Sequence, residues 1–444
     1  MKKEMLNTSA RNRTLKQGWI IQSVESVCLR ITSGGTPSRK EPSFFANGEI
    51  LWVKSSELKD YYIRNTSEKI TKAALDNSSA KLLPRNTVLI ALYGDGRTIT
   101  SLGILPGQAA CNQACCAVIC DDNLCYFKFM FYSLKYHREE LIALATGASQ
   151  RNLSGKLIRS FAIAVPPLQT QLKIASILSA YDDLIENNTR RIAILEEMSQ
   201  RLYKEWFVNF KFPGHETAKF VDSTLGMIPE GWRVLPLKDV SSKIGSGATP
   251  KGGKNSYRKS GISLIRSLNV YDNHFEFKDL AYISEKQATQ LDNVRIEKYD
   301  VLLNITGASV ARCCIVPSSL IPARVNQHVA IIRVIPDMAN PFFLLNTINN
   351  EHHKQQILAL AQGGATREAL TKETICNYKI VLPEFSLLRE YGLIAADLFG
   401  LSETLQRKNQ NLRKTRDMLL PKLISGELDV ENLDIDTGEA FVES

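Results

Sequence analysis

The chain has 444 residues, of which 44% are hydrophobic and 23% charged, the composition of an ordinary folded protein. No apolar run reaches the length of a membrane span, and the polar, basic start from Met1 to Lys16 lacks the apolar stretch of a signal peptide. Nine cysteines, an odd number, fit the reducing cytosol. These features exclude an integral membrane protein and predict a cytoplasmic one.

The net charge of +9 is distributed unevenly along the chain. The acidic tail, residues 427–444, contains seven acidic residues and no basic one, so the positive charge belongs to the rest of the chain. A basic body indicates a polyanionic partner, although an excess of lysine also serves solubility alone. We expect the tail to be a solvated end or to dock on a basic surface, such as a partner or the start of the chain.

A first globular unit is predicted over residues 18–167, after an N-terminal arm of residues 1–17. Short apolar runs alternate there with turn signals, which predicts an α+β unit large enough to bury its own core. The predicted elements are strands at 50–54, 87–92 and 117–120 and a helix at 126–145.

Residues 168–212 are predicted to form one long helix, because Gln169–Phe210 contains neither proline nor glycine and Pro213-Gly214 follows. Its apolar residues alternate at spacings of three and four, which is typical of a helix packed along another long helix. At 1.5 Å per residue the helix would span roughly 60 Å. The residues of this seam are Leu178, Tyr181, Ile185, Ile192, Leu195, Leu202 and Trp206, with Asn188 as a polar member.

The second half of the chain repeats this plan. The predicted segments are a linker at 213–230, a globular unit at 231–383, a long helix at 384–426 and the acidic tail. Within them we predict strands at 262–266, 300–303 and 329–334 and a helix at 341–360. The apolar residues at helical spacing in the second long helix are Ile394, Leu398, Leu401, Leu405, Leu412, Leu419 and Leu423. We expect the two long helices to pack antiparallel, with Ile185, Ile192, Leu195 and Leu202 facing Leu398, Leu401, Leu405, Leu412 and Leu419.

Residue identities confirm that the halves are related in sequence. A shift of 213 positions places Ser33–Pro37 on Ser246–Pro250, and a shift of 214 places Asn112-Gln113 on Asn326-Gln327. A shift of 217 places Pro166 on Pro383. A slowly drifting offset is expected of two diverged copies with small insertions, so the chain is a duplicated domain rather than a solenoid.

Three local patterns suggest chemistry but do not support it. Gly247–Ser256 lacks the lysine register of a phosphate-binding loop. Asn340-Pro341 is better explained as a helix N-cap followed by proline than as a methyltransferase motif. The cluster Cys111–Cys125 has no counterpart in the second copy, so small buried cysteines are favoured over zinc ligands.

The chain resembles the specificity (S) subunit of type I restriction-modification enzymes over essentially its whole length. The motifs that carry this resemblance lie at the ends of the long helices and at the start of the second unit. They are Pro166-Pro167-Leu168-Gln169-Thr170-Gln171, Leu202-Tyr203-Lys204-Glu205-Trp206-Phe207, Phe212-Pro213-Gly214, Gly226-Met227-Ile228-Pro229-Glu230-Gly231-Trp232 and Leu419-Leu420-Pro421-Lys422-Leu423-Ile424-Ser425-Gly426-Glu427-Leu428. The second helix departs from the pattern at Leu382-Pro383-Glu384-Phe385, which lacks the second proline and the glutamines.

The resemblance implies two mixed α/β target recognition domains, each reading one half of a split DNA sequence, and a pair of antiparallel coiled-coil-like helices that set the spacing. It also implies a pseudo-twofold repeat that matches the twofold character of duplex DNA. The implied partners are double-stranded DNA, two methyltransferase subunits and restriction subunits. AdoMet, ATP and magnesium would belong to those partners, so this chain needs no catalytic residue, metal or cofactor of its own.

We predict that DNA contacts cluster in the Gly-Thr-Pro loops and the strands behind them, because lysine and arginine meet phosphates or guanine edges there. In the first copy the candidates are Thr36, Ser38, Arg39, Lys40, Lys54, Ser55, Tyr93, Arg97, Gln150 and Arg151. In the second copy they are Thr249, Lys251, Lys254, Tyr257, Arg258, Arg266, Asn269, Thr306 and Arg367.

Two alternatives from other classes remain open on the sequence. One is an enzyme that modifies DNA by itself and carries a duplicated recognition domain, which requires a catalytic motif beyond those found. The other is a coiled-coil scaffold that binds no DNA, which a binding assay with random duplex at low salt distinguishes.

Overall fold

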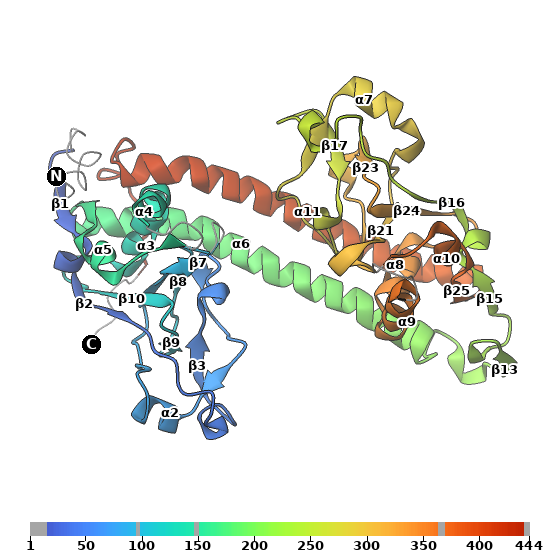
Figure 1. Ribbon diagram of the computed structural model, residues 1–444, viewed down its shortest axis with the longest axis horizontal. Helices are drawn as coiled ribbons and strands as arrows, with labels where there is room; N and C mark the ends of the chain where they lie inside the picture. The colour runs from blue at the N-terminus through green and yellow to red at the C-terminus, as the bar shows by residue number, and fades with distance from the viewer. Residues whose placement is uncertain (1–15, 95–97, 146–150, 363–368, 439–444) are drawn as a thin grey trace. The chain divides into compact units, whose positions relative to one another are not determined.

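The computed structural model (Figure 1) describes residues 16–94, 98–145, 151–362 and 369–438. The chain divides into two compact units, the first made of residues 1–187 and 408–444 and the second of residues 188–407. Each unit therefore combines one globular domain with parts of both long helices. The sequence predicted the long helices as segments separate from the globular domains. In the structure, each long helix is instead shared between the two compact units.

The first domain contains β1 (Ile20–Ser23), β2 (Cys28–Ser33), β3 (Ile50–Val53), β4 (Tyr61–Tyr62), β5 (Lys69–Ile70), β6 (Val88–Ala91), β7 (Tyr93–Gly94), β8 (Leu102–Ile104), β9 (Ala110–Cys111), β10 (Cys115–Cys120), β11 (Arg151–Asn152) and β12 (Ala162–Val165). Its short helices are α2 (Lys72–Asp76), α3 (Phe127–Tyr136), α4 (Arg138–Leu144) and α5 (Gly155–Ser160). One sheet has the strand order β2-β10-β6-β8-β4 and another the order β5-β3-β9. Every residue of β6 is buried, because apolar side chains occupy both of its faces at the centre of the sheet.

The second domain contains β15 (Arg233–Pro236), β16 (Ser241–Ser246), β17 (Ile262–Ile265), β18 (Val270–Tyr271), β19 (His274–Phe275), β20 (Ala281–Ile283), β21 (Val301–Asn304), β22 (Cys313–Ile315), β23 (Ala323–Val325), β24 (Val329–Val334) and β25 (Lys379–Leu382). Its short helices are α7 (Glu285–Gln290), α8 (Pro341–Asn349), α9 (Glu351–Gln362) and α10 (Lys372–Asn377). The sheets have the orders β16-β24-β21-β22 and β20-β17-β23.

The two domains share one topology. Strands β2, β10, β6 and β8 occupy the same order in their sheet as β16, β24, β21 and β22, and β5-β3-β9 corresponds to β20-β17-β23. In each of these three-stranded sheets the last pairing is parallel, β3 with β9 and β17 with β23. A ladder of the first and last strands closes each domain, β1 with β12 and β15 with β25. The duplication predicted from the sequence is therefore confirmed in the fold.

The first long helix, α6 (Leu168–Tyr203), continues as a π-helical turn over Lys204–Val208. The predicted helix is confirmed, but it ends at Val208, short of the predicted end at residue 212, and Phe210 beyond it adopts a left-handed φ of 55°. Trp206 and Phe207 of the wider turn are both buried in the core of the second unit. The helix therefore ends in a wide turn that buries these two rings, five residues before Pro213-Gly214.

The second long helix, α11 (Phe385–Ile424), has nearly the predicted bounds and contains Pro421 in its last turn. Within the first unit, Asp182 of α6 pairs with Arg416 of α11, and the amide of Asn409 donates to the carbonyl oxygen of Ile185 at 3.4 Å. Since residue numbers rise along α6 as they fall along α11, the helices run antiparallel, as predicted.

Not every predicted seam residue faces the seam. Ile185 and Leu405 are buried, but Leu401 is 42% exposed, so the prediction that Leu401 packs against the first helix is wrong. Ile394, which has the same helical spacing, is also 40% exposed. The buried positions of α11 instead include polar and small residues that keep the same alternating spacing. These are Ala395, Ser402 and Asn409. A search for apolar residues alone shifted the seam onto the neighbouring helix face.

Each predicted short helix is in fact two helices. The segment 126–145 breaks at His137, whose ring lies between those of Tyr136 and Phe161, at 4.7 and 5.2 Å between centroids. The segment 341–360 breaks at Asn350, whose backbone is extended and whose side-chain oxygen accepts from the N–H of His352 at 3.1 Å. An asparagine that caps the following helix favours such a break.

The predicted linker contains a hairpin, β13 (Phe220–Ser223) and β14 (Gly226–Pro229). The tail also has structure in its described part, within the first unit. Lys16 forms ion pairs with Asp429 at 2.5 Å and Glu431 at 2.8 Å, and Val430 is buried in the core of that unit. Of the two expectations for the acidic tail, docking near the start of the chain is the one observed.

Candidate nucleic-acid interface

The loop that follows β2 is held tightly against the turn between β9 and β10. The N–H of Gly34 donates to Cys115 at 3.1 Å, and the N–H of Gly35 donates to Cys111 at 2.9 Å. A Cβ atom at Gly34 would lie 2.2 Å from the carbonyl oxygen of Cys111. The position requires glycine because the two backbones approach too closely for any side chain.

The loop that follows β16 is built in the same way. The N–H of Gly247 donates to Val329 at 2.9 Å, and the N–H of Ala248 donates to Val325 at 3.0 Å. A Cβ atom at Gly247 would lie 2.1 Å from the carbonyl oxygen of Val325. The repeated sequence therefore encodes a repeated loop geometry, supported by equivalent backbone bonds in both domains.

Each loop presents a threonine that is bonded to a glutamine. The hydroxyl of Thr36 donates to Oε1 of Gln113, and the hydroxyl of Thr249 donates to Oε1 of Gln327. Both glutamines are exposed. Neither was among the predicted contacts, although the repeated Asn-Gln pair was the sequence signal that could have identified them.

In the first domain Arg39 is part of a charged cluster on two aromatic rings. Its guanidinium lies 4.5 Å from the ring centroid of Phe45 and 5.3 Å from that of Trp52. Arg39 and Lys54 both bind the carboxylate of Glu68, at 2.9 and 2.8 Å. These two cations lower the pKa of Glu68 to about 2, so the cluster retains one net positive charge at neutral pH.

The remaining candidates of the first domain are spread over neighbouring segments. Ser38 and Lys40 are exposed on the loop, and Ser55 begins a 3-10 turn after β3. Tyr93 is 36% exposed on β7. Arg97, Gln150 and the side chain of Arg151 lie outside the described residues, although the backbone of Arg151 pairs with Gly94 of β7.

In the second domain Lys251, Lys254 and Arg258 are exposed on the segment after the glycine loop. The guanidinium of Arg266 lies 5.5 Å from the ring centroid of Tyr257 and donates to the carbonyl oxygen of Asp279. This segment thus presents three exposed cations, and its Tyr257 stacks against an arginine that the domain already holds. Arg367 lies outside the described residues.

Asn269 does not qualify as a DNA contact. It is fully buried, and its amide donates to the carbonyl oxygens of Glu276 at 2.9 Å and Lys278 at 3.2 Å. Its Oδ1 accepts from the N–H of Arg266 at 3.1 Å. All of its polar groups brace the backbone between β17 and β20, so the prediction for this residue is corrected to a structural role.

A histidine that the sequence did not single out extends the polar group of the second domain. Nε2 of His328 lies 3.0 Å from the amide nitrogen of Gln327, and Nδ1 lies 2.7 Å from the hydroxyl of Thr306. Because the amide can only donate, Nε2 accepts and Nδ1 carries the proton that reaches Thr306. The predicted candidates Thr249 and Thr306 thus belong to one network.

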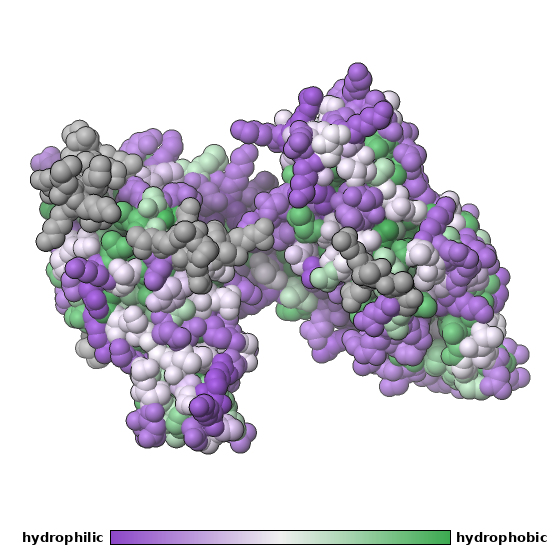
Figure 2. All heavy atoms as spheres, viewed as in Figure 1, coloured by the Kyte–Doolittle hydropathy of each residue, from purple (hydrophilic) through white to green (hydrophobic). Residues whose placement is uncertain are grey.

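Figure 2 shows hydrophilic residues densely covering the surface over α7 in the second unit. Hydrophilicity alone does not locate an interface, since much of any protein surface is polar. The matched loops of the two domains are more specific, because they combine a constrained backbone, exposed polar pairs and nearby cations.

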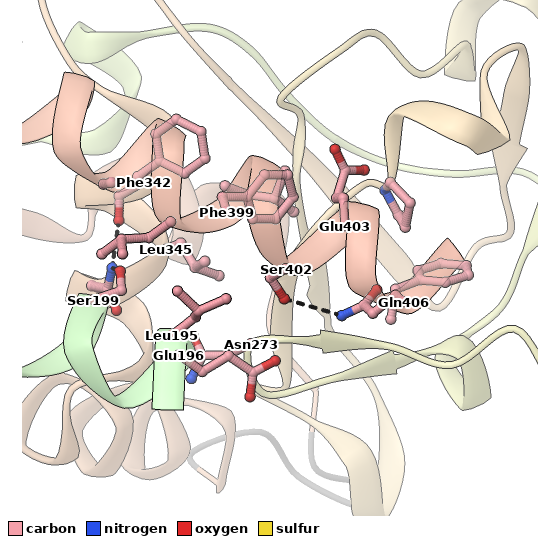
Figure 3. Close-up of a pocket in the computed structure, with 16 residues that line it drawn as sticks. Leu195, Glu196, Ser199, Asn273, Phe342, Leu345, Phe399, Ser402, Glu403 and Gln406 are labelled. Carbon is pink, nitrogen blue, oxygen red and sulfur yellow. Dashed lines mark hydrogen bonds between the residues drawn. The ribbon is translucent and has the colours of Figure 1, made fainter. Parts of the chain in front are cut away.

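A cavity of about 50 Å³ in the second unit has a different character (Figure 3). It lies between α6, α8 and α11, and apolar side chains such as Leu195 and Phe399 form much of its lining. Glu196 borders it, and burial raises the pKa of this carboxyl to about 7. Glu403 on the opposite helix instead accepts from the N–H of Ser318 at 2.7 Å. The cavity is a packing defect of the helix pair and too small for a nucleotide.

The cysteines behave as expected of small core residues. Cys111, Cys115, Cys116, Cys120 and Cys125 are all buried and unpaired. Across the part of the chain that the structure describes, no three His, Cys, Asp or Glu side chains are grouped to hold a metal ion. In the same described ranges, no helix is long and apolar enough to cross a membrane.

The duplicated α+β domains with matched polar loops, joined through long helices, define a protein of the DNA-recognition class. Residues 17–197 and 229–411 match the model of the type I restriction modification DNA specificity domain, and the chain belongs to this family. It is a specificity subunit, which is not the catalytic component of such enzymes.

Proteins named as specificity subunits match this chain, one over most of its length and another over less than half. The MjaIX specificity subunit of Methanocaldococcus jannaschii is 27% identical over 94% of this chain and 95% of its own length. The EcoR124I/EcoR124II specificity subunit of Escherichia coli is 29% identical over 41% of this chain and 46% of its own length. The crystal structure of the S subunit from M. genitalium covers 93% of this chain and 97% of that chain, with a TM-score of 0.59 and 16% identity. The last comparison establishes the shared fold.

Proposed function

We propose that this chain reads a DNA target in two separated parts, one part with each globular domain. The observation that supports the proposal most directly is the duplication itself. Two domains of equal topology carry the same constrained loop, but the residues that follow Thr-Pro differ, Ser38-Arg39-Lys40 in one and Lys251-Gly252-Gly253 in the other. Equal scaffolds with unequal contact residues suit the recognition of two different half-sites.

The proposed partners are double-stranded DNA, two methyltransferase subunits and, for cleavage, restriction subunits, acting in the cytoplasm. AdoMet, ATP and magnesium would be bound by those subunits. The long helices serve as a spacer, since a rigid helix can hold two readers about one DNA turn, roughly 34 Å, apart. In this proposal the domains at 18–167 and 231–383 read the DNA sequence. The helices at 168–212 and 384–426 set the distance between the two half-sites.

The contact set that we propose combines the predicted residues that the structure leaves accessible. In the first domain these include Arg39, Lys40 and Lys54, and in the second Lys251, Lys254 and Arg258. Arg39 is held by Glu68, so it is already oriented before DNA arrives and loses little side-chain entropy on binding.

Methylation mapping tests the proposal. The chain is expressed with its methyltransferase subunits in a host that lacks other adenine methylation, and modified adenines are mapped across the genome. We expect one motif made of two short specific parts separated by unspecified bases. Replacing residues 18–165 with the equivalent unit of a relative should change one part and keep the other. A continuous motif, or a swap that alters both parts at once, would contradict independent reading by two domains.

A further inference from the structure

The Thr-Gln pairs are retained in both domains while the residues around them differ. Thr36 and Gln113 correspond in position to Thr249 and Gln327, and each threonine hydroxyl donates to its glutamine. The residue that follows the glutamine is Ala114 in the first domain and His328 in the second. A feature that is identical in both readers cannot distinguish two different half-sites.

The pairs are also not required to hold the loops in place. The backbone bonds from Gly34 and Gly35 already attach the first loop to the turn after β9, and those from Gly247 and Ala248 attach the second. The glutamines are exposed, where a hydrogen bond between neutral groups contributes little to folding. Retention of an exposed side-chain bond on an already anchored loop therefore indicates an external ligand.

The orientation of the amide defines the chemistry of that ligand. Because Oε1 of each glutamine accepts from threonine, the NH2 group is the part left to bind a ligand, and it can only donate. The NH2 of Gln113 has no partner among the described residues. Gln327 directs one N–H toward His328 at 3.0 Å and retains the other. The ligand must therefore be a hydrogen-bond acceptor that is present at both half-sites whatever their sequence.

We infer that Gln113 and Gln327 each donate to a DNA phosphate, with Thr36 and Thr249 orienting them, and that the two pairs place both domains on the backbone in the same register. Neutral side chains such as glutamine are common phosphate ligands, and such contacts position a protein without carrying sequence information. This inference rests on the proposed function. It separates the loops into a shared positioning part and a divergent reading part.

Glutamine-to-glutamate variants test the inference, because Glu keeps the oxygen that accepts from threonine and replaces the NH2 donor with a negatively charged oxygen. The complex with methyltransferase subunits is titrated with a duplex carrying the mapped target and with a scrambled duplex of equal length. Gln113→Glu and Gln327→Glu should each weaken binding to both duplexes by a similar factor, roughly 10- to 100-fold. The methylated motif should remain unchanged.

Two further variants serve as controls. Gln169→Glu adds the same charge at an exposed position in the first turn of α6, and it should leave affinity nearly unchanged. Gln113→Leu removes the donor without adding charge, so it tests the inference even if the glutamate variant folds poorly. It should also weaken binding to both duplexes by equal factors.

Three outcomes would overturn the inference. Wild-type affinity in both glutamate variants would show that the Thr-Gln pairs only stabilise the loops and do not contact DNA. Weaker binding to the target alone, with a changed half-site, would make the glutamines base readers. A loss equal to that of Gln169→Glu would show a general charge effect. By contrast, a wild-type complex that binds neither duplex and methylates no motif would refute the proposed function itself.

Discussion

The buried ion pair between Asp182 of α6 and Arg416 of α11 should be a major determinant of helix pairing in the first unit. Asp182 is 4% exposed, and the Arg416 side chain is 11% exposed. Asp182 also accepts from the hydroxyl of Tyr132 at 2.8 Å, while Arg416 has a second, exposed partner in Asp417 at 2.8 Å. The two members of the pair are therefore unequally dependent on each other.

Removing Arg416 leaves the buried carboxylate of Asp182 with one hydrogen-bond donor among the described residues, the hydroxyl of Tyr132, and with the weaker attraction of the Lys128 and Lys135 charges. Arg416→Met should therefore destabilise the first unit by about 3–5 kcal/mol. Removing the charge of Asp182 is milder because Asp417 remains available to Arg416, so Asp182→Asn should cost about 1–3 kcal/mol. In the double variant neither charge is left unpaired. It should be more stable than Arg416→Met alone, with a coupling of about 1–3 kcal/mol.

Hydrogen exchange is the appropriate assay, because the chain contains two units and a single global transition cannot be assumed. Exchange of the amides over 171–187 and 408–424 should accelerate in Arg416→Met and recover in the double variant, while the amides of the second domain serve as an internal reference. If the single losses simply add in the double variant, or if Arg416→Met loses less than about 1 kcal/mol, the pair does not hold the helices in the way described.

Three other predictions follow from single residues or segments. Burial raises the pKa of Glu196 to about 7, so ionisation destabilises the fold increasingly as pH rises from about 4.5 to 7. Glu196→Gln should therefore match the wild type below pH 5 and stabilise the second unit by roughly 1–3 kcal/mol above pH 7, allowing for partial solvation, and equal hydrogen-exchange protection of that unit in both proteins at pH 8 would contradict this. Gly247→Ala should lower the melting temperature and weaken DNA binding, because the added Cβ would meet Val325 at 2.1 Å, whereas Gly245→Ala, with nothing within 4 Å, is the matched control. Inserting one heptad into α6 alone should change the spacing of the methylated motif by about three base pairs or abolish methylation, since seven residues add roughly 10 Å, and an unchanged spacing would exclude the helix as the spacer.

Several features could be predicted because they depend on local sequence. The proline-free and glycine-free run from Gln169 predicts a long helix, since nothing in it interrupts the backbone ladder. The drift of matching residues from 213 to 217 positions reveals the duplicated domain, and strands β2 and β16 near its start and β12 and β25 at its end show these two offsets. The Asn340-Pro341 cap is also confirmed, with the asparagine side chain accepting from Phe342 at 2.9 Å. In each case the physical cause lies within a few residues or in a repeated pattern.

Other features depend on contacts between residues far apart in sequence. Periodicity could not assign Asp182 and Arg416 to the interior, because a buried charge is tolerated only where a specific partner meets it. Asn269 is fully buried, because the backbone groups of Arg266, Glu276 and Lys278 satisfy its side-chain amide. Arg39 is oriented by Glu68 and the ring of Phe45, which the chain brings together only on folding. Propensity acts along the chain, whereas the environment of a polar side chain is created by tertiary packing.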